Sequence, residues 1–444
     1  MTALLESEPG RALLSDAPRS LVVDGIRATL DDARRGGPRH ASPAEWIAQA
    51  AGRVRDMQQL SLRPVLNATG VVLHTNLGRA PLATAAIDAI VRVASGYSNL
   101  EYDVTAGSRG SRYAHAVALL RELTGAEDAL VVNNNAGALV LALDTLARGR
   151  EAIVSRGELV EIGGSFRVPD IMAKGGARLV EVGTTNRTHL ADYQRAIGAD
   201  TGAVVRVHRS NFALEGYVAE ANARELASLC AGRGVPLLHD LGSGLLMSLA
   251  SLGLTGEPTA SEAVADGATV VTMSGDKLLG GPQCGIIVGT RAVIERMRQN
   301  PLTRAFRVDK LTLAALEATL ALYREPERAL AEIPALAMLG VTVAALRKRG
   351  KALLRDIGSI PGATLSLQES SASVGGGAFP VAKIPSLAIA VESASATSLE
   401  RALRLGTPAV ISRVEDERVL LDLRTVPARD DDALRRALIS ALAS

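Results

Sequence analysis

The sequence has little cysteine and histidine, the residues that build disulfide frameworks and many metal centres. Only Cys230 and Cys284 occur among the 444 residues, and their spacing matches no cysteine motif. The six histidines are scattered and form none of the short spacings typical of metal ligands. We therefore expect no metal centre and no disulfide scaffold. So little cysteine is also typical of a reducing, cytoplasmic compartment.

The chain also lacks an excess of charge of either sign and a long apolar segment. Its 49 Lys and Arg residues nearly balance 47 Asp and Glu residues, which gives a formal net charge of +2. Because no general basicity is present, we expect no DNA partner, and any contact with RNA has to be local. No apolar run is long enough to cross a bilayer, and the N-terminus lacks a signal-peptide core. We expect a soluble protein with no membrane partner.

What the chain does contain is a repeated alternation of short apolar strands with helices. This pattern predicts an α/β protein with a mostly parallel sheet and more than one domain. Residues 1–60 predict a small helical domain, and residues 61–310 predict a large α/β domain that carries the candidate sites. Residues 311–444 predict a connecting helix followed by a smaller α/β domain.

A single lysine in a loop of small residues is the most informative feature. Lys277 follows a strand-like apolar run and precedes Gly280 and Gly281. A lysine that carries an aldehyde cofactor has to be desolvated, and glycines let a ring and a phosphate approach the backbone. The segment therefore predicts a lysine that binds pyridoxal phosphate as a Schiff base. A surface lysine in a glycine-rich turn is the alternative.

Asp240 lies at the end of a second apolar strand and precedes a Gly/Ser loop. In open α/β sheets, ligands bind outside the carboxyl ends of strands. Pyridoxal phosphate enzymes use an acidic residue at this place to hold a proton on the ring nitrogen. Asp240 fits that role, although an aspartate that only caps the next loop remains the alternative.

A third segment predicts a seat for the cofactor phosphate. An apolar strand and an Asn-rich turn precede a helix rich in small residues, and the N–H groups at a helix N-terminus attract phosphate. The candidate cofactor-binding residues here are Asn135, Ala136 and Gly137, and Ser274 adds a hydroxyl from the lysine loop. An ordinary helix cap is the alternative.

Six segments carry motifs that periodicity alone does not supply. They are residues 63–82, 155–167, 181–189, 240–244, 274–282 and 374–377, and the first contains Asn76-Leu77-Gly78-Arg79. Together they resemble the bacterial selenocysteine synthases, the L-seryl-tRNA(Sec) selenium transferases. The resemblance covers nearly everything from residue 61 onward, whereas the first sixty residues match least distinctly.

The resemblance implies a fold-type-I pyridoxal phosphate transferase with an aspartate aminotransferase-like large domain. It implies that Lys277 bonds the cofactor and that Asp240 partners its ring nitrogen. The implied reaction converts L-seryl-tRNA(Sec) to L-selenocysteinyl-tRNA(Sec) with selenophosphate, through a cofactor-bound aminoacrylyl group, for selenoprotein synthesis. Lys277, once displaced by the seryl amine, is the expected base.

The selenium donor carries a phosphate of its own, which calls for further cations. The family pattern points to Arg79, Arg304 and Arg307, since guanidinium groups bind phosphate oxygens in pairs. For Arg304 and Arg307, a solvated helix face with three-residue spacing is the alternative. Arg109 and Arg112 are expected either to contact phosphate or RNA backbone or to belong to a polar loop.

The family also implies an assembly of identical chains and a tRNA contact in residues 1–60. We expect a homo-oligomer built from dimers, most simply a decamer. Residues 1–60 contain eight arginines, no lysine and eight acidic residues, so their charge sums to zero. A tRNA contact there requires arginines gathered on one face, and the alternative is an amphipathic helical cap. The candidates for that face are Arg27, Arg34, Arg35, Arg39, Arg53 and Arg55.

Two other functions stay open at this point. One is a pyridoxal phosphate lyase or dehydratase acting on a small amino acid or an amino sugar phosphate. The other is a tRNA-binding protein that has the fold but catalyses no reaction. The presence of both Lys277 and Asp240 argues against this alternative.

Overall fold

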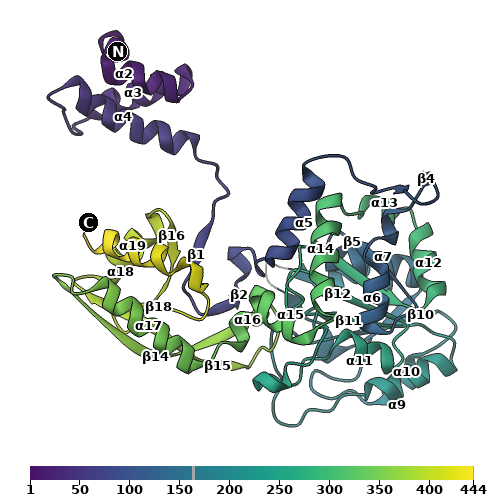
Figure 1. The fold of residues 1–444 in the computed structure, drawn as a ribbon. Coiled ribbons are helices and arrows are strands. Elements are labelled where there is room, and N and C mark those ends of the chain that lie inside the picture. Colours follow the sequence, from purple (N-terminus) through teal and green to yellow (C-terminus); the bar gives the residue numbers. More distant parts are fainter. Residues whose placement is uncertain (163–165, 444) are drawn as a thin grey trace. The chain divides into compact units, whose positions relative to one another are not determined.

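The computed structural model describes residues 1–162 and 166–443, which form two compact units, residues 1–64 and 65–444 (Figure 1). The first unit is helical. Its helices are α1 (Thr2–Glu6), α2 (Glu8–Asp16), α3 (Arg19–Arg34) and α4 (Pro43–Gln58). Serine side chains cap α2 and α4, and Val22, Ile26 and Val54 lie in the core between the helices.

Ion pairs hold three of the six arginines proposed for a tRNA-binding face. Arg27 pairs with Asp24, Arg34 with Asp31, and Arg53 with Asp32. These carboxylates cancel much of the local positive charge. The ion pairs thus reduce the local positive charge at three of the six positions, and a contact of the first unit with tRNA stays a prediction.

The large sheet of the second unit has seven strands in the order β5-β13-β12-β11-β10-β6-β9. Only β13 runs antiparallel to its neighbours, so the sheet is mostly parallel, as the alternation of strands and helices predicts. The strands are β5 (Asp128–Val132), β6 (Glu151–Ser155), β9 (Arg178–Val182), β10 (Thr201–Val207), β11 (Leu237–Gly242), β12 (Val270–Ser274) and β13 (Gly285–Gly289).

Helices cover both faces of this sheet, and the strands are accordingly apolar at successive positions. Leu130 and Val132 face one cluster, which contains residues of α7 (Asn135–Ala147), α8 (Val168–Lys174) and α12 (Arg291–Gln299). Ala129 and Val131 face the other. The helices on that opposite side are α6 (Val117–Thr124), α9 (Leu190–Ala196), α10 (Ala223–Gly232), α11 (Ala260–Ala265) and α14 (Lys310–Leu322).

A second sheet of five strands, in the order β17-β18-β15-β14-β2, lies in the C-terminal region. Its strands are β2 (Val71–Leu73), β14 (Ala363–Gly375), β15 (Lys383–Ser393), β17 (Arg413–Glu415) and β18 (Arg418–Asp422), and α17 (Val343–Ile357), α18 (Ala396–Leu405) and α19 (Asp431–Leu442) pack against it. β1 (Val65–Asn67) pairs with β16 (Ala409–Ile411). Residues 65–73 thus fall inside the predicted segment 61–310 but pair with C-terminal strands.

The remaining elements connect these layers. They are η1 (Thr75–Leu77), α5 (Thr84–Ala94), β3 (Tyr102–Asp103), β4 (Ser108–Arg109), η2 (Arg112–Ala114), η3 (Arg156–Glu158), β7 (Glu161–Ile162), β8 (Phe166–Arg167), η4 (Ala250–Leu252), α13 (Leu302–Ala305), α15 (Pro326–Glu332), α16 (Pro334–Gly340) and η5 (Ala428–Asp430). Part of the family-like segment 155–167, residues 163–165, lies outside the described residues. Within the described ranges, no helix has the length and apolar character needed to cross a membrane.

Candidate active site

The carboxyl ends of β11 and β12 lie side by side and place the two strongest candidates at one sheet edge. Asp240 on β11 is the register partner of Thr272 on β12, and the loop after β12 carries Lys277. A cavity of about 280 Å³ opens at this edge. Its walls include Lys277, Asp240, Asn135, Ala136, Ser274 and Arg79, together with Asn134, Leu139, Gly242, Asp276 and Gln283.

Asp240 is a buried carboxyl group with two hydrogen-bond donors from the protein. Its Oδ1 accepts from Asn135 Nδ2 at 2.8 Å and from Thr272 Oγ1 at 2.9 Å. Burial raises the pKa of Asp240, while the two hydrogen bonds and the charge of Lys277 lower it in part. A protonated ring nitrogen in the cavity is the charge partner that such a carboxylate needs.

Lys277 is only 5% exposed, and burial lowers the pKa of its amine, with Asp240 acting in the opposite direction. An amine with a lowered pKa is more often neutral and therefore nucleophilic. Two glycines keep the space around it open. A Cβ atom added to Gly377 would lie 3.5 Å from Lys277 Nζ, and one added to Gly242 would lie 3.7 Å away. Both glycines have φ above +70°, a conformation that disfavours any side chain.

The first turn of α7 fits a phosphate, but with fewer donors than the sequence predicts. The Asn134 side chain caps the helix and accepts from the Gly137 N–H at 2.8 Å, and Gly137 does not line the cavity. The Asn135 side chain is occupied by Asp240. Among the described residues, the backbone N–H groups of Asn135 and Ala136 have no partner and remain for a phosphate. With the buried amine and carboxyl, these groups suit pyridoxal phosphate.

The three arginines proposed for the selenium donor lie in two places. Arg79 lines the cavity, and its Nη1 lies 2.7 Å from Asp276 Oδ2. Arg304 and Arg307 do not line it. α13 ends at Ala305, and Arg307 forms a β-bridge with Val132 at the end of β5. Arg304 and Arg307 therefore do not share one solvated helix face, which was the alternative for this pair.

Arg304 and Arg307 lie close enough to Tyr113 for their charges to act on its hydroxyl, and Arg112 and Glu101 form a polar cluster beside it. Arg112 donates to Glu101 Oε1 at 2.7 Å and to the Val308 carbonyl at 2.8 Å. The Arg112 hydrogen bond holds the pKa of Glu101 below its usual range, and the charges of Arg109 and Arg307 act in the same direction. Arg112 is therefore engaged inside the chain, whereas the Arg109 side chain is 85% exposed.

Sequence reasoning missed several residues that shape the cavity. Thr272 fixes Asp240, Asp276 holds Arg79, and Asn134 caps α7. The buried hydroxyl of Ser210 lies near Lys277, since a Cβ atom on Gly377 would meet both. The only sequence signal for Thr272 is its position one strand away from Asp240, which requires the register to be known.

Glu158, in the family-like segment 155–167, is a buried carboxyl group with a strongly raised pKa. Burial raises its pKa to about 7, although Arg206 and a hydrogen bond from the Val207 N–H act against this. The unfolded chain binds its proton only below about 4.5. Glu158 thus stabilises the fold fully below about pH 4.5, and that contribution is lost as the pH rises to and through about 7.

We expect Glu158→Gln to remove this pH dependence. One pKa unit corresponds to about 1.4 kcal/mol, so the free energy of unfolding of the wild type should fall by about 3 kcal/mol as the pH rises through this range. The gap in unfolding temperature between variant and wild type should therefore shift in favour of the variant between about pH 5 and about pH 8. The exposed Glu369→Gln is the control, and a gap that stays constant with pH contradicts the assignment.

Two family models match this chain. The L-seryl-tRNA selenium transferase model matches residues 65–427, and the model for the N-terminal region of selenocysteine synthases matches residues 3–34. The chain belongs to the L-seryl-tRNA selenium transferase family. The first match contains Lys277, Asp240 and all three candidate arginines.

Curated members of the family are similar over nearly their whole length. The L-seryl-tRNA(Sec) selenium transferase of Moorella thermoacetica is 50% identical over 437 residues, which cover 97% of this chain and 93% of that protein. The enzyme of the same name from Geobacter sulfurreducens is 50% identical over 449 residues, which cover 99% of this chain and 96% of that protein. The match therefore extends through the helical first unit.

A solved structure supports the fold of this family member. The structure of D-glucosaminate-6-phosphate ammonia-lyase is 22% identical, has a TM-score of 0.58, and covers 87% of this chain and 98% of that chain. Together with the mostly parallel sheet and the lysine loop, this likeness confirms the predicted fold-type-I, aminotransferase-like architecture. The family is one of pyridoxal phosphate enzymes, which confirms the cofactor inferred from Lys277 and Asp240.

Proposed function

We propose that this chain converts L-seryl-tRNA(Sec) to L-selenocysteinyl-tRNA(Sec) with selenophosphate as the selenium donor. The observation that carries the proposal is the buried Lys277 beside Asp240, within the segment that matches the selenium transferase family. The names of the curated relatives support the same reading. They give no support to a lyase or to a tRNA-binding protein without chemistry.

The residues of the cavity divide the chemistry between them. Pyridoxal phosphate, held by Lys277 and Asp240, would supply an aldehyde group for the seryl amine and an electron-withdrawing ring for its α-carbon. Asp240 holds a proton on the ring nitrogen. Lys277 Nζ, freed by the seryl amine, takes the α-proton and gives a proton to the departing hydroxyl oxygen, which leaves as water. The buried amine suits this work because burial lowers its pKa.

Arg79 is the cation best placed for the phosphate of the selenium donor. It lines the same cavity as Lys277, and Asp276 fixes one end of its guanidinium group. The group still has other N–H donors for phosphate oxygens. The ester of seryl-tRNA has no free carboxylate, so an arginine here has no competing anion from the seryl substrate.

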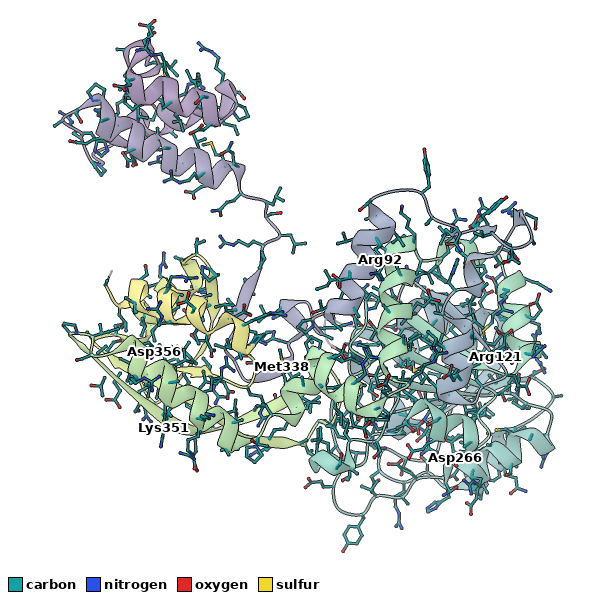
Figure 2. All side chains as sticks on the ribbon, viewed as in Figure 1. Arg92, Arg121, Asp266, Met338, Lys351 and Asp356 are labelled. Carbon is teal, nitrogen blue, oxygen red and sulfur yellow. The ribbon has the colours of Figure 1, made fainter. Side chains whose placement is uncertain are left out.

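Replacement of Arg79 should weaken binding of the selenium donor. We expect Arg79→Ala to raise KM for selenophosphate by roughly 10- to 100-fold, because the variant loses a charge-assisted hydrogen bond to the phosphate. The KM for seryl-tRNA should stay unchanged. Arg79→Lys keeps a charge beside Asp276 and should have a smaller effect. Arg121→Ala, at an exposed position on α6 (Figure 2), is the surface control. An unchanged KM for selenophosphate contradicts this role.

The proposed enzyme works as an assembly of identical chains, with dimers arranged most simply as a decamer. Apolar side chains on α5 support a contact between copies: Ile87 is 46% and Val91 is 58% exposed, and Leu311 on the neighbouring α14 is 37% exposed. The first unit, residues 1–64, is proposed to contact the tRNA, and the cytoplasm is the proposed site of action.

A selenium-transfer assay tests the function directly. Purified holoenzyme, seryl-tRNA(Sec) and labelled selenophosphate should give labelled selenium bound to tRNA, released as selenocysteine on mild alkaline deacylation. The same preparation should release little ammonia from free serine or amino sugar phosphates. Turnover of the small amino compounds without labelled tRNA would falsify the transferase assignment and favour the lyase.

A further inference from the structure

A second cavity, of about 610 Å³, opens at the end of β10, next to the strand that carries Asp240. Its polar walls include Glu158, His208 and Glu257, and its apolar walls include Leu214 and Val381. The volume lies within the range of small-molecule sites, roughly 300–1,000 Å³. The chemistry proposed above makes no use of this cavity.

Glu257 is a buried carboxylate in this wall whose hydrogen bonds are incomplete. Its side chain is 1% exposed. Oε2 accepts from the Phe379 N–H at 3.1 Å and lies 3.2 Å from His208 Nε2. Oε1 and His208 Nε2 have no hydrogen-bond partner among the described residues. A buried acceptor without a donor is costly, so the site calls for a ligand that donates a hydrogen bond.

The second cavity adjoins the lysine site through two structural connections. Val207, at its edge, is the register partner of Asp240. Gly377, which approaches Lys277 Nζ, and Phe379, which donates to Glu257, belong to the same loop. The second cavity therefore lies next to the lysine site at the same sheet edge, and the charge of Glu257 acts on Lys277.

The charged groups of the cavity indicate what can bind there. Glu158, Glu220, Glu257 and Glu262 line it together with Arg206 and Arg209, and Glu220 pairs with Arg209 and lies 3.8 Å from Arg206. Glu220 thus engages both cations, and the unpartnered Oε1 of Glu257 is left to accept a hydrogen bond from a hydroxyl or amino group, which a phosphate oxygen cannot donate. In a charged tRNA, only the terminal nucleoside lacks a phosphate on its 3′ side, and it carries the seryl ester there. It is also the nucleoside nearest to Lys277 during the reaction.

We propose that this cavity binds the 3′-terminal nucleoside of seryl-tRNA, with Glu257 accepting a hydrogen bond from its ribose or base and Leu214 and Val381 contacting the base. The assignment rests on the proposed function, because it supposes that the seryl group is esterified to RNA. It makes the end of the tRNA, and not the serine alone, a recognised part of the substrate.

Two probes separate the nucleoside from the amino acid. One is the seryl amide of 3′-amino-3′-deoxyadenosine, a stable mimic of the charged tRNA end, and the other is serinamide. Both amines displace Lys277, so the change in holoenzyme absorbance on titration gives an apparent Kd for each. We expect wild-type holoenzyme to bind the nucleoside probe at least about tenfold more tightly than serinamide.

Glu257→Gln should remove about tenfold of that preference, because the amide presents a donor where the carboxylate presented an acceptor. Glu262→Gln is the matched control. Glu262 lines the same cavity, but its Oε2 already accepts from the N–H and the hydroxyl of Thr259, each at 2.8 Å. The preference should survive in this variant. Val381→Asp, at an exposed rim position, gives a second test that does not depend on a buried substitution.

Each outcome decides one assignment. Equal binding of the two probes by the wild type, or full preference retained in both Glu257→Gln and Val381→Asp, overturns the nucleoside site. Either result is compatible with normal selenium transfer to seryl-tRNA(Sec), so the proposed function survives it. An absence of selenium transfer to the full tRNA overturns both.

Discussion

Lys277→Ala should reduce selenium transfer by at least about 10³-fold, because one substitution removes both the covalent anchor of the cofactor and the base for the α-proton. The visible absorbance of the holoenzyme should also change, since alanine has no amine to bond the cofactor aldehyde. The measurements are single-turnover selenium transfer to seryl-tRNA(Sec) and the absorbance spectrum after incubation with pyridoxal phosphate. The side chain is buried at the cavity wall, so solvent amines do not replace it readily.

The matched control is Lys351→Ala. Lys351 lies on α17 and is exposed, as Figure 2 shows, so its loss should leave both absorbance and turnover unchanged. Unfolding temperatures of the two apo variants check that Lys277→Ala has folded. Folded Lys277→Ala with wild-type turnover excludes this amine as the proton acceptor and directs attention to another base.

The sequence indicates where Lys277 and Asp240 lie because Asp240 stands near the end of one apolar strand and Lys277 follows another, while their roles stay predictions. The chemistry of each residue is local: a lysine among glycines and an aspartate at a strand end each have a recognisable pattern. The parallel sheet then places β11 beside β12, and the two carboxyl ends coincide. That both residues line one cavity follows from these two facts together.

The features that the sequence did not predict depend on contacts between residues far apart in the chain. Thr272 and Ser210 contribute through register and loop geometry, and neither belongs to a local motif. The three-residue strand β2 pairs with β14, about 300 residues later, and this separation left no signal in the local pattern. The alternative considered for Arg304 and Arg307, a shared helix face, does not apply, because the helix ends at Ala305 and a β-bridge determines where Arg307 lies. Their role toward the selenium donor stays a prediction.

The phosphate seat illustrates how side chains compete for the same donors. The turn before α7 predicts free N–H groups at Asn135, Ala136 and Gly137. In the structure the Asn134 side chain takes the Gly137 N–H, and the Asn135 amide bonds Asp240. The asparagine turn does line the cavity with Lys277 and Asp240, but the Asn135 side chain bonds Asp240, and the contact of this turn with a cofactor phosphate stays a prediction. Only the side-chain geometry separates these two uses.

Asp240→Asn should lower the rate of selenium transfer by roughly 10²- to 10³-fold while leaving the fold intact, the usual cost of removing one electrostatic stabiliser. Asparagine keeps an oxygen that accepts from Asn135 and Thr272, so the hydrogen bonds of the cavity survive. What it loses is the negative charge that we propose holds a proton on the ring nitrogen. Because burial already raises the pKa of Asp240, the neutral variant should not be less stable than the wild type.

The effect of Asp240→Asn should appear in the rate and not in substrate affinity, since the ring-nitrogen charge matters most when the α-proton leaves. A deuterium label at the seryl α-carbon tests this: the isotope effect on turnover should grow in the variant as proton removal becomes rate-limiting. Asp356→Asn, exposed on α17 (Figure 2), is the control and should change neither rate nor isotope effect. A variant with a higher KM, an unchanged kcat and no larger isotope effect would assign Asp240 to substrate binding, and the ring nitrogen would then need another partner.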